Sequence, residues 1–64
     1  MNRIGEHLRL KGQKQKWLAE QLGMTTVMIS LYVQNKRQPK LETLLKISKI
    51  LKIEVTELID QNSI

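Results

Sequence analysis

Residues 15–39 constrain the fold of this 64-residue chain more than any other stretch. Their sequence, QKWLAEQLGMTTVMISLYVQNKRQP, has the spacing of two short amphipathic helices on either side of a glycine. Two helices that cross steeply need a small residue where they approach, a glycine in the turn and a branched apolar residue where the second helix packs back. Ala19, Gly23 and Ile29 stand at those three positions. The spacing therefore predicts a tightly turned helix pair over about residues 15–34.

The rest of the chain has the apolar spacing of further short helices. The five expected helices cover residues 3–11, 14–22, 25–34, 41–51 and 56–60. The side chains that can cap a helix start by accepting a backbone N–H are Asn2, Thr25 or Thr26, and Thr56. The apolar stripe of the fourth helix consists of Leu44, Leu45, Ile47, Ser48 and Leu51. The sequence thus predicts one all-α domain over residues 1–64, a compact bundle of five helices in which residues 61–64 fray.

The net charge of +5 is placed unevenly along the chain. Residues 1–40 carry eight Lys and Arg against two Glu, whereas residues 41–64 carry three Lys against four acidic residues. A basic part of this kind is typical of a protein that binds a polyanion such as a nucleic acid. General solubility is the alternative explanation of the same charge.

The composition argues against an enzyme, a metal site and a membrane protein. The chain has no Cys and a single His, His7, so it lacks the ligands of a zinc site and the partners of a disulfide. The acidic residues are scattered, and the isolated glycines form no phosphate-binding loop. No cofactor is expected. No apolar run approaches the roughly 20 residues that span a membrane, and no signal-peptide pattern opens the sequence, which suits a cytoplasmic protein.

Residues 15–39 resemble the helix-turn-helix of the lambdoid phage repressor and Cro family. The matching residues are Gln15, Leu18-Ala19, Leu22-Gly23, Ile29-Ser30 and Lys36-Arg37-Gln38-Pro39. The resemblance implies a lambda-repressor-like DNA-binding domain with its helix-turn-helix at helices two and three. It also implies that the third helix enters the major groove, usually in a dimer on a palindromic operator. Two departures from the family are Val33, where many relatives carry Glu, and Asn35, where they carry Gly.

The third expected helix presents an outward stripe that is unusual for a solvated helix. Its members are Thr26, Val27, Ser30, Leu31 and Gln34. In a major groove, Val27 and Leu31 can pack on thymine methyl groups. Thr26 and Ser30 can hydrogen-bond base edges there. The resemblance agrees with base contacts on this stripe, and it implies phosphate contacts by Gln15, Thr25, Gln34, Lys36 and Arg37.

Sequence-specific binding of double-stranded DNA by a small transcriptional repressor is the function that these patterns favour. Ile50, Ile53 and Ile59 exceed what so small a core must bury. We expect some of them to form a homodimer contact that places two reading helices about 34 Å apart. A monomer with exposed isoleucines is the alternative. The competing function is a protein-binding module, such as an antitoxin or adaptor, that docks a partner protein through the Val27/Leu31 face.

Overall fold

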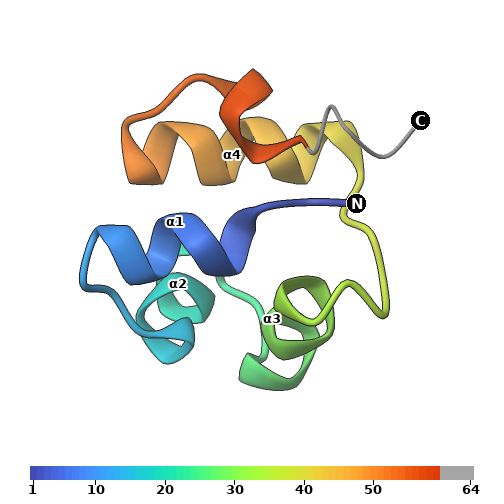
Figure 1. Ribbon diagram of the computed structural model, residues 1–64. Helices are drawn as coiled ribbons and strands as arrows, with labels where there is room; N and C mark the ends of the chain where they lie inside the picture. Colours follow the sequence, from blue (N-terminus) through green and yellow to red (C-terminus); the bar gives the residue numbers. More distant parts are fainter. Residues whose placement is uncertain (60–64) are drawn as a thin grey trace.

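The computed structural model describes residues 1–59, which form a small bundle of helices (Figure 1). Its elements are α1 (Ile4–Leu10), α2 (Gln15–Leu22), α3 (Thr26–Val33), α4 (Leu41–Leu51) and a 3-10 helix, η1 (Val55–Leu58). The only sheet-like pairing within these residues is an isolated antiparallel bridge between Asn2 and Ile59. The all-α prediction is confirmed, although the fifth element is a 3-10 helix and not an α-helix. The expected fraying of residues 61–64 lies outside the described residues.

The starts of α1 and α3 are capped in different ways. Thr25 caps α3 as expected, because its Oγ1 accepts the Met28 N–H at 3.2 Å. The cap position of α1 is Arg3, which makes no side-chain cap bond. Asn2, the predicted cap residue, lies one residue before the observed cap position, yet its Oδ1 still accepts the Ile4 N–H at 3.0 Å.

The residue that caps η1 differs from the predicted one. Thr56 was expected to cap the last helix, but it lies inside η1, and Glu54 is the cap residue. Glu54 and Glu57 form a capping box, in which each side chain accepts the other residue's backbone N–H. His7 Nε2 donates to the Glu57 carbonyl at 3.0 Å and so ties η1 to α1.

Left-handed residues end all four α-helices, the first of them Gly12 after α1, with φ 67°. Gly23 has φ 67°, and after it the Met24 N–H bonds the Ala19 carbonyl at 2.9 Å, so the chain turns sharply from α2 into α3. Asn35 has φ 58° and replaces glycine after α3, as the sequence predicted. Lys52, also at φ 58°, ends α4 in the same way without a local sequence signal.

One apolar core joins all five elements. Its buried members are Ile4, Leu8, Leu18, Ala19, Ile29, Tyr32, Ile47, Leu51 and Leu58. Burial of each large side chain stabilises the fold by about 1.5–3 kcal/mol. Trp17 is half-buried and packs against this core. Leu45, expected in the inner stripe of α4, is instead 43% exposed.

Gly5 allows α1 and α3 to approach closely. A methyl group at Gly5 would lie 2.8 Å from Val33 Cγ1, which is closer than two carbon atoms can pack. The branched side chain at Val33 therefore occupies space that only glycine leaves free.

We expect Gly5→Ala to lower the free energy of unfolding by about 1 kcal/mol, because overpacking outweighs the better helix propensity of alanine. In a Val33→Ala background the same change should instead stabilise the protein, since the methyl group then has only ordinary contacts, 3.8 Å from the Cβ and the carbonyl oxygen of residue 33. Urea midpoints of the four proteins in this cycle measure both effects. A Gly5→Ala change with the same sign in both backgrounds would contradict the contact.

Candidate nucleic-acid interface

Helix α3 is apolar on more sides than the core can cover. Ile29 and Tyr32 are buried on its inner side, whereas Val27 is 71% exposed on its outer side. Leu31 is half-exposed and lies outside the buried core. A helix that is apolar all round is usually buried completely, so an exposed apolar side indicates a surface that meets a partner.

Three polar side chains, those of Thr26, Ser30 and Gln34, share the outer side of α3 with this apolar surface. Gln34 Nε2 donates to Ser30 Oγ at 2.7 Å, so the Gln34 side chain lies back along the helix. Ser30 thus uses its oxygen as an acceptor and keeps its hydroxyl proton for a second partner. Thr26, one turn earlier, is exposed.

The N-terminal end of α3 can hold an anion beside Thr25. Thr25 Oγ1 already accepts the Met28 N–H, so its own proton is available to a phosphate oxygen. The free backbone N–H groups of the first turn add partial positive charge at this end.

The loop after α3 carries two cations at the other end of the helix. Lys36 and Arg37 are exposed, and neither forms an ion pair within residues 1–59. Their backbone N–H groups both bond the Leu31 carbonyl, at 3.0 and 3.3 Å. The loop is therefore folded onto the last turn of α3, and its charges stay close to the outer side of the helix.

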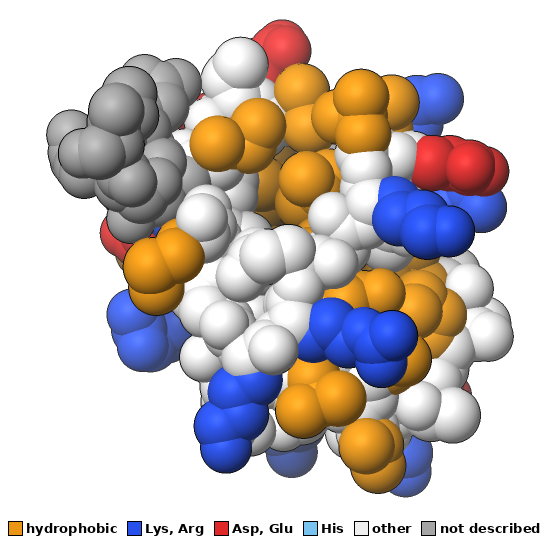
Figure 2. Space-filling model, turned by 90° about the vertical axis from the view of Figure 1, so that its right-hand side faces the viewer, with side chains coloured by type: hydrophobic (Ala, Val, Ile, Leu, Met, Phe, Trp, Pro, Cys, Tyr) orange, Lys and Arg blue, Asp and Glu red, His pale blue; other side chains and the backbone are white. Residues whose placement is uncertain are grey.

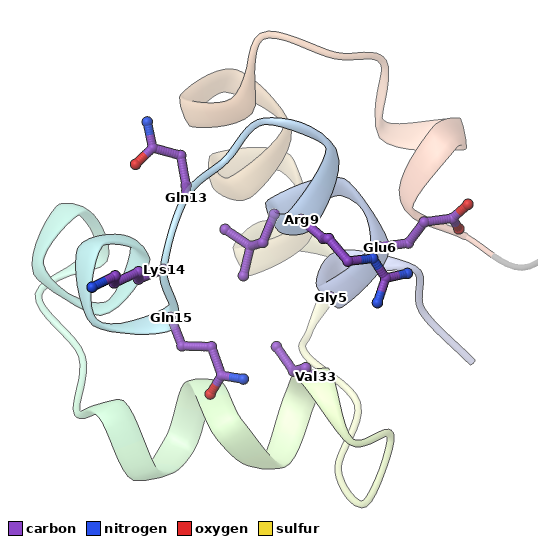
Figure 3. Close-up of a pocket in the computed structure, with 8 residues that line it drawn as sticks. Gly5, Glu6, Arg9, Gln13, Lys14, Gln15 and Val33 are labelled. Atoms are coloured by element: carbon purple, nitrogen blue, oxygen red, sulfur yellow. The ribbon is translucent and has the colours of Figure 1, made fainter.

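An open groove connects the start of α2 with the end of α3 (Figure 3). Its lining residues are Gly5, Glu6, Leu8, Arg9, Gln13, Lys14, Gln15 and Val33. The Gln15 side chain points from α2 toward α3 in this view and so lies beside that helix. Arg9 and Lys14 line the same groove, and no local sequence pattern marks either of them as a contact residue.

One acidic side chain lies in this groove with the basic ones. Arg3 Nε donates to Glu6 Oε2 at 2.8 Å. This hydrogen bond lowers the pKa of the Glu6 carboxyl below its usual value, so the carboxyl stays ionised at neutral pH. Arg3 thus offsets the negative charge of Glu6 near Arg9.

The outer side of α3 is flanked by a polar residue at its start and by a basic loop at its end. Thr26, Val27, Ser30 and Leu31 occupy successive turns of one side of α3, between Thr25 at its start and the basic loop at its end. An α-helix is about 10–12 Å wide with its side chains, and the major groove of B-DNA is about 12 Å wide. The fold and the site define a helix-turn-helix DNA-binding domain.

Comparison with known proteins agrees with this class. A protein-family model described as helix-turn-helix matches residues 6–58. The crystal structure of a Bacteroides fragilis protein, provisionally described as DNA-binding, matches with a TM-score of 0.93 and 38% sequence identity, over 94% of this chain and 97% of that one. The comparison with curated proteins gives no match. The chain belongs to the helix-turn-helix family of the lambdoid repressor and Cro type.

DNA binding is the function of this family, whose members are normally regulators and not enzymes. None of the helices within residues 1–59 has the length and apolarity that crossing a membrane requires. The same residues contain no group of His, Cys, Asp or Glu placed to hold a metal ion.

Proposed function

We propose that the protein is a dimeric transcriptional repressor that binds a palindromic operator and reads each half-site with α3 in the major groove. The observation that carries this proposal is the exposed Val27, on a side of α3 whose neighbours, Thr26 and Ser30, are polar. A dimer bound across a promoter represses by occupying the DNA that a polymerase needs.

The proposed contacts divide into two kinds. Base contacts come from Thr26, Val27, Ser30 and Leu31. Phosphate contacts come from Gln15, Thr25, Gln34, Lys36 and Arg37. Because Ser30 offers a proton, it suits a base acceptor such as purine N7, while Val27 suits a thymine methyl group. We therefore expect half-sites that contain A·T pairs.

The length of α3 supports a dimer. Eight residues of helix extend for about 12 Å, which matches only three or four base pairs of 3.4 Å each. The longest extent of the domain is 31 Å, so one copy cannot place reading helices in two grooves about 34 Å apart. A second copy doubles the number of bases that are read.

The proposed contact between the copies is an exposed apolar face beside the start of α4. Its members are Met1, Leu41, Leu45 and Ile59, which are 65%, 63%, 43% and 40% exposed. Figure 2 looks onto this side and shows hydrophobic side chains gathered in its upper part, over α4, with a second group lower down, over α3. Of the three isoleucines expected in the dimer contact, Ile59 belongs to this face. Ile50 and Ile53 are half-buried and pack against the core of their own copy.

Selection of bound sequences from a random double-stranded DNA library tests the proposal directly. The expected product is an inverted repeat with half-site centres about 10 base pairs apart. Binding that is absent, or that does not weaken as salt rises, would favour the protein-docking module. A recovered site without a repeat would contradict the dimer.

Arg37→Ala should reduce the salt dependence of DNA binding. Each lost phosphate contact lowers the slope of log K against log salt by about 1, because one fewer counterion is released. Titrations of a DNA duplex at several salt concentrations give this slope. Lys49→Ala is the matched control, since Lys49 is an exposed cation of α4, away from α3. Equal slopes for Arg37→Ala and the wild type would exclude the phosphate contact.

A further inference from the structure

The N-terminal segment is bonded to the loop that follows α3. Asn35 Oδ1 accepts the Asn2 N–H at 2.7 Å, and Asn35 Nδ2 donates to the Asn2 carbonyl at 3.2 Å. Asn2 Nδ2 donates to the Tyr32 carbonyl at 2.9 Å and to Gln38 Oε1 at 3.1 Å. Gln38 Nε2 closes the network by donating to Asn35 Oδ1 at 3.1 Å. Asn2 thus bonds three residues that lie 30 to 36 positions further along the chain.

The same segment is fixed on its other edge. The Arg3 N–H bonds the Leu58 carbonyl at 2.8 Å, next to the bridge between Asn2 and Ile59. Asn2 is itself buried, and its side-chain and backbone polar groups all have partners. Buried polar groups that are fully bonded resist displacement, because opening the network would leave them without partners. Asn2 is therefore a rigid support for the loop.

The bonds to Asn2 lie on both sides of the basic pair Lys36 and Arg37. Asn35 comes directly before Lys36, and Gln38 comes directly after Arg37, so both neighbours of the basic pair are tied to Asn2. We infer that this network, here called the Asn2 clamp, sets the loop in its binding conformation before DNA arrives. Asn2 is then a positioning residue, which touches no DNA and acts through Lys36 and Arg37. This role rests on the proposed phosphate contacts of those two residues.

Fixing the loop conformation before binding affects the DNA affinity differently from the loss of a phosphate contact. A loop that is disordered in the free protein must be ordered on binding, and that ordering weakens the complex. The number of phosphates finally contacted stays the same, however, so the counterion release and the salt slope do not change. Loss of the clamp should lower affinity at a constant slope, whereas loss of Arg37 lowers the slope itself.

Asn35→Gly separates the clamp from the backbone conformation of the loop. Glycine accepts the φ of 58° without strain but has no amide to bond Asn2. Lys52→Gly makes the same kind of replacement at the left-handed end of α4 and serves as the control for stability. Gln38→Ala is a second variant at an exposed position, which removes only the two bonds of the Gln38 side chain.

The experiment measures duplex DNA affinity over a salt series and amide hydrogen exchange at Lys36 and Arg37. For Asn35→Gly we expect three- to tenfold weaker binding, an unchanged slope and faster exchange at both amides, and for Gln38→Ala smaller changes in the same directions. Wild-type affinity and exchange in both variants would overturn the clamp. A slope lowered by about 1 would also overturn it as stated, because Asn35 would then support a contact and not a conformation. Failure of the wild type to bind DNA would instead overturn the proposed function, and this role with it.

Discussion

Leu41→Glu is expected to lower the affinity for a palindromic operator about 100-fold while leaving the fold intact. Leu41 is the first residue of α4 and 63% exposed, so a glutamate there costs little packing and suits the positive end of the helix. In the proposed contact, each copy would bury a charged carboxylate against the apolar face of the other, and removing that charge from water is unfavourable. When the two copies no longer contact each other, each binds its half-site separately. The gain in effective concentration that comes from linking the two copies is then lost.

The matched control for this prediction is Leu10→Glu. Leu10 is 71% exposed at the end of α1, so the variant has the same charge change outside the apolar face. Operator titrations and sedimentation at micromolar concentration compare the three proteins. Equal affinities for Leu41→Glu and Leu10→Glu would contradict the proposed dimer contact, as would a monomeric wild type.

Shortening the exposed apolar side chains of α3 should weaken sequence-specific DNA binding and change little else. We expect Val27→Ala and Leu31→Ala each to weaken binding to the selected site by about 1–3 kcal/mol, because they lose the contact with a thymine methyl group. Binding to non-specific DNA depends on the phosphate contacts and should stay nearly constant.

Replacing thymine by uracil in the selected site, which deletes the methyl group, sharpens this test. The wild type should bind the uracil site more weakly than the thymine site. The alanine variant of the residue that contacts the methyl group should bind both sites equally, because it has already lost that contact. Leu10→Ala controls for the loss of an exposed apolar side chain. Equal losses on specific and non-specific DNA would mean that Val27 and Leu31 support the fold and read no base.

The helix pair was predictable because its steric requirements are local and each has few solutions. Ala19, Gly23 and Ile29 lie within eleven residues, and the structure places Ala19 and Ile29 in the core and Gly23 in a left-handed turn. The cap at Thr25 was predictable for the same reason, since the residue and its partner are three positions apart. The capping box of Glu54 and Glu57 has equally short spacing, but its sequence signature has Ser, Thr, Asp or Asn at the cap position, so a glutamate there is not recognised by it.

The Asn2 clamp could not be found in this way. Its bonds join residues 30 to 36 positions apart, and no local pattern records which asparagine meets which. The exposed apolar face was missed for a related reason. A count of isoleucines shows an excess of apolar residues but not which ones stay exposed, and α4 exposes Leu41 and Leu45 while Ile50 turns toward the core.

The pairing of residues 2 and 3 with residues 58 and 59 also bears on how the protein is made. During synthesis on a ribosome, α1 emerges first but its leading residues find their partners only after η1 has followed. Contacts between distant parts of a chain form late because a long loop must close first. Folding of this helical bundle is therefore completed only when residues 58 and 59 are available. On the proposed function, a nascent or prematurely ended chain lacking η1 carries every proposed DNA-contacting residue but lacks the bonds of Leu58 and Ile59 that fix the segment around Asn2, which supports the loop.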